Sequence, residues 1–315
     1  MMRLFLCLTM LVFTVMNGYA QVEVRLIPEI VSLQKFSDDP VKLVDAARRY
    51  QLQQADLTGW DLELAHRHDE ADENASRDSK ADQIRKRTAN MKAVWDYVLG
   101  EYPNNPRALN YFGEFWYDYG GDTNKAITYW KRSAALDPST GFADNNLGLH
   151  YFHTGQYKFG HNYLQKALTA DETNPDFLFN IAQMYLTYFV QLEEILKKDR
   201  KRLFREAMRY SKDAAKYAPD DFEIVQDYAV NFFAGANLGV EVDWKTAADA
   251  WVDVRALVTN REQRFYTLLN EGRCWTRDED SARALERYEQ ALALRPQSII
   301  TQELVVKTKA ALKQP

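Results

Sequence analysis

The sequence predicts an all-α protein in which pairs of helices repeat and stack as a solenoid. One indication is a recurring pattern in which Gly113 of one copy and Gly148 of the next lie 35 residues apart. A fixed period of this size is typical of repeat proteins. Composition agrees, because 46% of the 315 residues are hydrophobic and 13% aromatic, whereas glycine (13) and proline (9) are sparse. Apart from a possible short strand at 22–26, no run of strands is visible.

Each copy of the pattern predicts two helices that cross closely. Gly113 and Gly148 lie in the first helix and leave room for the second helix to approach. Trp130 and Leu164 each follow a small residue by four positions in the second helix, so the small and large residues share one helical face. The first copy closes at Pro138, since proline has no N–H group to continue a helix.

The pattern divides the chain into repeats with a cap at each end. The third repeat contains about 13 extra residues, which we expect as additional turns on both of its helices. A solenoid can grow to this length without dividing into globular domains. The predicted repeats are 107–138, 142–175, 176–219, a degenerate copy at 222–258, and 265–296, all within 104–296, followed by a C-terminal capping helix at 297–315.

The repeat resembles the tetratricopeptide repeat (TPR), a helix-turn-helix unit of 34 residues with the signature W-x2-L-G-x2-Y. The matching residues are Leu109, Phe112-Gly113 and Trp116 in the first copy, and Leu147-Gly148 and Tyr151 in the second. The resemblance implies a right-handed α-α superhelix of about five helix pairs with N-terminal and C-terminal capping helices. It also implies a concave groove, lined by the first helices of successive units, that takes a partner peptide or helix.

The resemblance places ten side chains in this groove. They are Asn110, Glu114 and Tyr117 in the first unit, Asn145, Leu149, Phe152 and His153 in the second, and Phe179, Gln183 and Leu186 in the third. Members that clamp a C-terminal carboxylate use paired lysine and asparagine on these helices. Here Glu114, Leu149 and Gln183 occupy the positions where the clamp needs asparagine. The three first helices contain no lysine. We therefore expect an aromatic, apolar groove for a helix or an aromatic-bearing peptide; the alternative is that these side chains only contact the neighbouring unit.

The region 21–103 is expected to form an irregular helical cap. A helix start is visible at 37–40, where an N-cap candidate precedes proline. A second helix follows from Ala81 and ends near Gly100. Between them, the segment 67–87 holds six acidic and six basic residues and is either a solvated helix or a flexible linker.

The first twenty residues have the pattern of a signal peptide. Arg3 precedes an apolar stretch of about 12 residues, and small residues at Gly18 and Ala20 precede Gln21. An uncleaved anchor is the alternative, although a spanning helix needs about 20 apolar residues. We expect a periplasmic or extracellular protein, cleaved near Ala20, with no membrane span afterwards. A Gram-negative-type periplasm is favoured.

Charge argues against a general nucleic-acid binder. The chain has a formal net charge of −5, and loss of Arg3 brings this to about −6. One run of basic residues in the third repeat is an exception to the net negative charge. It is either a solvated turn or a docking patch for an acidic protein or an anionic envelope surface. It consists of Lys197, Lys198, Arg200, Lys201, Arg202 and Arg205.

The sequence contains no arrangement typical of catalysis. G-x-S-x-G, H-E-x-x-H, C-x-x-C and G-x-G-x-x-G motifs are all absent. We therefore expect no enzyme activity, no cofactor and no metal. The alternative is a metal-dependent enzyme that uses either the charged segment with His66 and His68 or a cluster of His150, His153 and His161.

The interpretation from sequence is a non-catalytic scaffold that binds a protein or peptide at the cell envelope. A self-associating structural component of an envelope assembly is the alternative from another class, and the sequence indicates no oligomeric state. Once the leader is removed, Cys274 is the only cysteine, so no intramolecular disulfide can form. It is expected to be a buried apolar residue, with a reactive thiol as the alternative.

Overall fold

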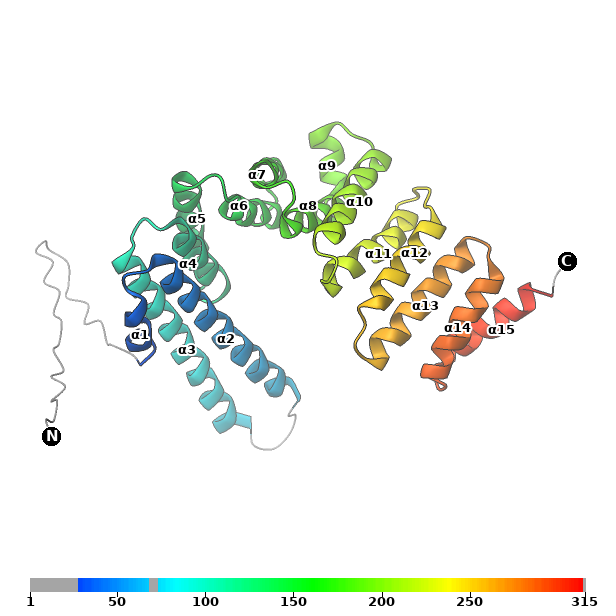
Figure 1. Ribbon diagram of the computed structural model, residues 1–315, viewed down its shortest axis with the longest axis horizontal. Helices are drawn as coiled ribbons and strands as arrows, with labels where there is room; N and C mark the ends of the chain where they lie inside the picture. Colours follow the sequence, from blue (N-terminus) through cyan, green and yellow to red (C-terminus); the bar gives the residue numbers. More distant parts are fainter. Residues whose placement is uncertain (1–27, 68–72, 314–315) are drawn as a thin grey trace, which may run out of the picture. The chain divides into compact units, whose positions relative to one another are not determined.

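The computed structural model describes residues 28–67 and 73–313, and within these ranges all side chains except those of 60–79. The described residues form fifteen α-helices and one short 3-10 helix, with no strand among them, so the predicted all-α class is confirmed. The chain divides into two units, one ending at Pro103 and one beginning at Asn104 (Figure 1). The predicted signal peptide, the possible strand at 22–26, and the side chains of His66 and His68 lie outside what is described.

The first unit is built on two long helices. Their antiparallel pairing is fixed by a buried hydrogen bond in which Trp95 Nε1 donates to Gln51 Oε1 at 2.6 Å. The carboxylate of Asp39 starts the first long helix by accepting from the backbone N–H of Lys42 at 3.0 Å. The elements of this unit are α1 (Pro28–Leu33), the 3-10 helix η1 (Gln34–Phe36), α2 (Pro40–Arg67) and α3 (Glu73–Glu101).

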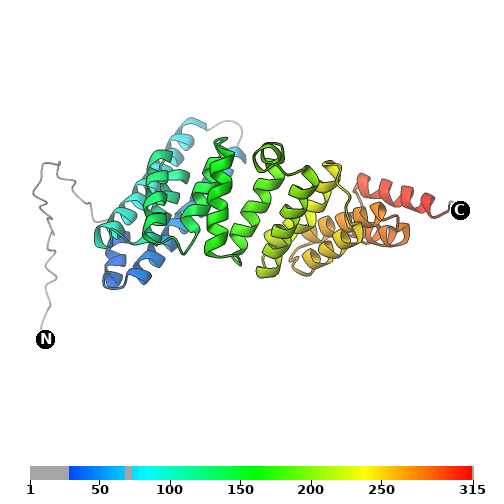
Figure 2. The same ribbon diagram turned by 90° about the horizontal axis from the view of Figure 1, so that it is seen from above.

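The second unit consists of helices that follow one another in chain order (Figures 1 and 2). The first helices of successive pairs are α4 (Pro106–Asp118), α6 (Phe142–His153), α8 (Pro175–Thr187), α11 (Phe222–Asn237) and α13 (Arg261–Arg277). The second helices are α5 (Thr123–Leu136), α7 (Tyr157–Ala170), α10 (Arg200–Tyr217), α12 (Trp244–Ala256) and α14 (Ser281–Leu294). The last helix is α15 (Ile299–Ala311).

Short polar side chains begin most of these helices. Asn105 accepts from the backbone N–H of Ala108 at 2.9 Å, and Asp122 accepts from that of Lys125 at 3.0 Å. Such caps satisfy N–H groups that have no partner inside the helix, and each contributes about 1 kcal/mol. The same arrangement is found at Asn174, Asp199, Asp221, Asp243, Asn260, Asp280 and Ser298.

Small residues meet large ones where the two helices of a pair cross, as the sequence predicted. A Cβ atom on Gly113 would lie 2.5 Å from the ring of Trp130, and one on Gly148 would lie 2.7 Å from the side chain of Leu164. Real Cβ contacts are essentially never this short. Only glycine therefore fits at these two crossings.

The insertion in the third repeat differs from the expectation. Helix α8 has 13 residues, the same as α4, so it carries no extra turn. Instead the inserted residues form a separate short helix, α9 (Phe189–Leu196), and lengthen α10 to 18 residues. Leu192 is fully buried, which anchors α9 to the core. The prediction of extra turns was right for the second helix, α10, and wrong for the first, α8, because residue spacing counts inserted residues without showing where the chain turns.

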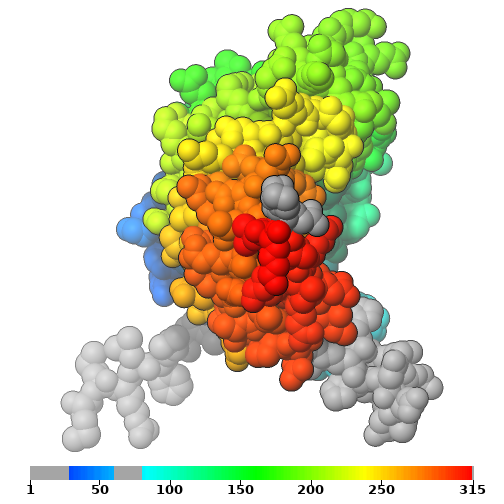
Figure 3. All heavy atoms as spheres, turned by 90° about the vertical axis from the view of Figure 1, so that its right-hand side faces the viewer, coloured from blue at the N-terminus to red at the C-terminus, as the bar shows by residue number. Residues whose placement is uncertain are grey.

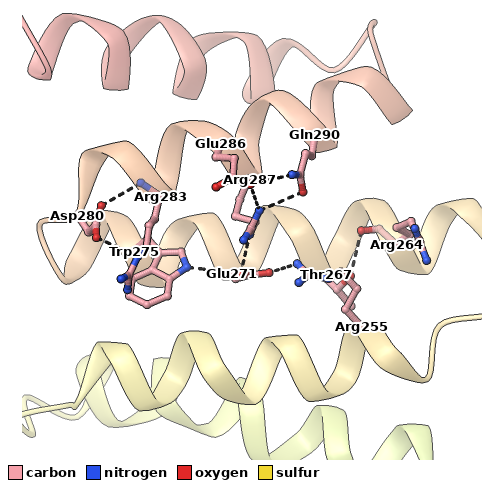
Figure 4. A network of polar contacts seen from close by, with 10 residues as sticks. All are labelled: Arg255, Arg264, Thr267, Glu271, Trp275, Asp280, Arg283, Glu286, Arg287 and Gln290. Carbon is pink, nitrogen blue, oxygen red and sulfur yellow. Dashed lines mark hydrogen bonds and ion pairs between the residues drawn. The ribbon is translucent and has the colours of Figure 1, made fainter.

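A buried ion cluster ties together three helices near the C-terminal end. The carboxylate of Glu271 on α13 is 1% exposed and is bound by Arg255 of α12 and Arg287 of α14 (Figure 4). The Arg287 Nε atom lies 2.7 Å from the Glu271 Oε1 atom. Because the two arginines come from the helices on either side, Glu271 joins neighbouring repeats.

Helix α15, at the red end of the chain in Figure 3, ends the second unit and packs on α14. The packing buries Thr301, Val305 and Thr308. Its opposite face leaves Ile299 and Val306 exposed.

Candidate functional site

A row of amide and carboxylate side chains runs across the first helices. Between α4 and α6, Asn146 Nδ2 donates to Asn110 Oδ1 at 3.1 Å and to Glu114 Oε1 at 3.2 Å. Asn110 Nδ2 also donates to Glu114 Oε1 at 2.9 Å. Asn110 is buried, whereas Glu114 and Asn146 are half-buried. The two helices are therefore joined by polar groups that partly face solvent.

The row continues along the next helices. Asn180 Nδ2 on α8 donates to Asn145 Oδ1 on α6 at 3.2 Å, and Gln183 Nε2 on α8 donates to Asp227 Oδ1 on α11 at 2.6 Å. We call the whole set the polar row. It consists of Asn110, Glu114, Asn145, Asn146, Asn180, Gln183 and Asp227.

Asp227 is the most enclosed acid of the polar row. Its Oδ2 atom accepts from Asn231 Nδ2 at 2.7 Å and from Ser211 Oγ at 3.1 Å. Burial nevertheless raises the pKa of this carboxyl above its ordinary value, because desolvation outweighs the hydrogen bonds from Ser211, Asn231 and Gln183.

The polar row holds three of the predicted groove residues on α4 and α6, namely Asn110, Glu114 and Asn145, and Gln183 on α8. Sequence reasoning missed Asn146, Asn180 and Asp227. A signal for two of them exists, because Asn146 lies 36 residues after Asn110 and Asn180 lies 35 residues after Asn145. The repeat period itself places these asparagines opposite each other on neighbouring first helices.

Other predicted groove residues pack within the repeats. The Tyr117 ring lies 5.3 Å from that of Trp130 and 5.8 Å from that of His150. Leu149, Phe179 and Leu186 are half-buried and pack against the core of the second and third repeats. These four side chains offer a partner only part of their surface.

Phe152 and His153 lie at opposite extremes of exposure. Phe152 is fully buried, and its ring stacks on that of Tyr188 with centroids 5.5 Å apart. Its side chain therefore belongs to the core and cannot line a groove, which corrects the expectation from sequence. His153, the last residue of α6, is exposed.

The basic run is partly neutralised by acidic neighbours. Glu206 is bound by Lys198 Nζ at 2.6 Å and by Arg202 Nε at 3.3 Å. Arg200 Nε lies 3.8 Å from a carboxylate oxygen of Glu193. The remaining cations of the run, Lys197, Lys201 and Arg205, are exposed and form no ion pair with a described residue.

The histidines of the second repeat face different neighbours. The His150 ring contacts Tyr117 of α4, whereas the His161 ring lies 5.9 Å from Tyr185 of α8. Burial lowers the pKa of both imidazoles. Among the described residues, no group of three or more histidine, cysteine, aspartate or glutamate side chains is arranged to bind a metal. Cys274 is fully buried, and burial raises its thiol pKa to about 12.

A cleft that sequence reasoning did not predict opens between two second helices. Helices α5 and α7 both pack on α6, and the space between them has a volume of about 730 Å³. Lys131 lies on the α5 side, Tyr163 and Lys166 on the α7 side, and Asp144 and Leu147 of α6 form the floor. We call it the α5–α7 cleft.

No protein-family model matches the chain, and no curated protein matches it in sequence. Solved structures do match. The C-terminal part of a TPR repeat-containing protein from Cytophaga hutchinsonii is 11% identical, over 87% of this chain and 98% of that one, with a TM-score of 0.53. This likeness confirms the predicted tetratricopeptide-repeat fold.

Two further solved structures match with lower TM-scores. PilF from Pseudomonas aeruginosa is 14% identical, over 81% of this chain and 99% of that one, with a TM-score of 0.47. YrrB, a TPR protein with an unusual peptide-binding site, is 18% identical over 66% of this chain and 96% of its own, with a TM-score of 0.47. In the part of this chain that the structure describes, no helix combines the length and hydrophobicity needed to span a bilayer.

Proposed function

We propose that this chain is a non-catalytic protein-interaction scaffold of the cell envelope, and that a segment of its partner binds along the polar row. The observation that carries the proposal is the row itself. Asparagine and glutamine each offer both donors and an acceptor, which is the hydrogen-bonding pattern of a peptide backbone. An extended or helical segment lying across α4, α6 and α8 would meet such groups at every repeat.

The hydrogen bonds within the row favour binding. Asn146 and Asn180 are each held by a neighbour from the adjacent repeat, so their rotamers are set before a partner arrives. Ordering a flexible side chain on binding costs about 0.5–1.5 kcal/mol, and a side chain already held avoids part of this cost. Both residues are half-buried, so each keeps surface that a partner can reach.

The charge of the first helices indicates which kind of partner segment can bind along the polar row. Helices α4, α6, α8 and α11 contain six acidic residues and one basic residue, Arg107. The polar row includes Glu114 and Asp227 and no cation. A neutral or basic segment therefore suits this face. A C-terminal carboxylate, which some TPR proteins bind with a clamp of lysine and asparagine, does not.

Assignment to the envelope rests on the predicted signal peptide, so the partner is sought there. Tagged protein would be used to capture partners from an envelope extract, with Asn146→Ala plus Asn180→Ala as the test variant. Loss of hydrogen bonds worth about 1 kcal/mol at each position predicts about a tenfold or greater loss of the specific partner. Mass spectrometry of the captured proteins measures it.

The matched control is Asn124→Ala plus Asn162→Ala, which removes two exposed asparagines from the second helices α5 and α7. It should recover the partner at the level of the unaltered protein. Equal recovery by the test variant, with an unchanged circular dichroism spectrum, would place the binding surface elsewhere. Recovery of the chain itself as the sole binder would support the self-associating alternative.

A further inference from the structure

We propose that the α5–α7 cleft is a second docking site and that it takes an acidic peptide segment. Its volume of about 730 Å³ falls within the range of about 300–1,000 Å³ found for binding pockets. The cleft lies between second helices, whereas the polar row lies on first helices. The two sites share only α6, which supplies Asp144 and Leu147 to the cleft floor and Asn145 and Asn146 to the polar row.

The walls of the cleft are basic. Helix α5 contains Lys125, Lys131 and Arg132 with no acidic residue, and α7 contains Lys158 and Lys166 with none. In a chain whose formal net charge is −5, these two acid-free helices are a local exception, and Asp144 is the one acidic residue among those that line the cleft. It gives the cleft a positive potential that attracts carboxylates.

Two of these cations line the cleft itself. Lys131 comes from α5 and Lys166 from α7, and both are exposed. Neither forms an ion pair with a described residue, although the Lys166 Nζ atom lies 4.8 Å from the centre of the Tyr163 ring, and the Lys166 charge opposes the effect of burial on the pKa of Asp144. Two ammonium groups on opposite sides of one cleft can each bind a carboxylate of the same ligand.

The floor of the cleft selects a peptide over other anions. Asp144 is 7% exposed, and no described residue donates a hydrogen bond to its carboxylate or forms an ion pair with it. The carboxylate oxygens are not enclosed, so a peptide N–H group in the cleft can donate to them. Phosphodiester groups carry no such donor, which favours a peptide over nucleic acids and phospholipid headgroups. Because Asp144 also repels carboxylates, the acidic side chains of the ligand belong at the lysines and its backbone at Asp144. A flat membrane surface also cannot reach the floor.

Apolar groups complete the site. The half-buried ring of Tyr163 on one wall gives contact surface for an apolar side chain, while Ala134, Ala135 and Ala170 leave space between the helices. The expected ligand therefore has alternating character, with carboxylates for the lysines and apolar side chains between them.

The test uses a fluorescently labelled glutamate-rich peptide with leucine at every third position, bound to the full chain and followed by fluorescence anisotropy. Lys131→Glu plus Lys166→Glu should weaken binding by about tenfold or more, because two attractive pairs become repulsive. Lys245→Glu plus Lys307→Glu is the control, since both lysines are exposed and distant in sequence, and the change in charge is the same. It should leave binding within about twofold.

Several outcomes would overturn the proposal. They are no binding of the glutamate peptide, equal weakening by the control variant, or equally tight binding of a lysine-rich counterpart. Anionic lipid vesicles or single-stranded DNA that bind as tightly as the peptide, and lose binding in the same test variant, would show the site to be a general polyanion surface. Asn146→Ala plus Asn180→Ala should not change peptide binding, which separates this proposal from that for the polar row.

Discussion

Glu271 shows how much one side chain can contribute to joining repeats. It is 1% exposed, yet it is charged, and it is bound by arginines from neighbouring helices and by Trp275 Nε1, which donates to its Oε1 atom at 3.5 Å. Taking a carboxylate out of water is expensive, and the cost is recovered only while its partners remain in place. Removal of one arginine partner should therefore lower the free energy of unfolding far more than the loss of an exposed arginine.

We predict that Arg287→Met lowers the free energy of unfolding by an amount near the lower end of about 3–5 kcal/mol, because Arg255 still binds part of the charge. Urea denaturation followed by circular dichroism measures it. Arg264→Met, at an exposed position of α13, is the control and should change the free energy by at most about 0.5 kcal/mol. Equal effects of the two substitutions would contradict the cluster's role.

At the scale of elements, the helix pairs are held by the fit of a small residue against a large one. Three crossings show this arrangement, and the crossing of α6 with α7 shows it twice. The pairs are Gly113 with Trp130, Gly148 with Leu164, Gly160 with Phe152, and Gly272 with Tyr288. At Gly148 and Gly160 the backbones themselves are close, since a Cβ on Gly160 would lie 2.9 Å from the carbonyl oxygen of Gly148.

We predict that Gly148→Leu destabilises the second unit by about 1–3 kcal/mol or more, because the added side chain collides with Leu164 in a packed crossing. Thermal unfolding followed by circular dichroism measures it as a lower melting temperature. Ala310→Leu adds a larger side chain at an exposed position of α15 and should leave the melting temperature nearly unchanged. An unchanged melting temperature for Gly148→Leu would refute this crossing.

At the scale of the whole molecule, the first three repeats of the second unit carry charges of opposite sign on their two sets of helices, whereas α12 and α14 are balanced and α13 is net basic. The first helices α4, α6, α8 and α11 are mostly acidic, whereas α5, α7 and α10 hold twelve basic and two acidic residues. The two proposed sites differ in charge in the same way. The polar row suits a neutral or basic segment, and the α5–α7 cleft suits an acidic one.

In a solenoid of this kind, a destabilising substitution in one repeat should affect only that repeat and its neighbours, because each repeat contacts the next and no distant one. We predict that Arg287→Met speeds amide hydrogen exchange in α12, α13, α14 and α15 and leaves α4 to α7 unchanged. Exchange followed by mass spectrometry resolves these segments. A uniform increase across the second unit would show instead that it unfolds as one cooperative body.

The sequence by itself determined the class and the repeat. Helical periodicity, the 35-residue spacing of Gly113 and Gly148, and the large residues opposite them were enough to predict stacked helix pairs, because these signals act within one repeat. Part of the polar row was expected from the resemblance to the tetratricopeptide repeat.

Only the tertiary structure decided which side chains face a partner. Phe152 is in the core, Glu271 is enclosed by arginines from two other helices, and the inserted residues turn to make α9. The α5–α7 cleft exists because two helices rest on α6 without closing over it. Periodicity gives the buried face of a helix, but it does not say which residues from other helices meet that face. That information lies in contacts between repeats.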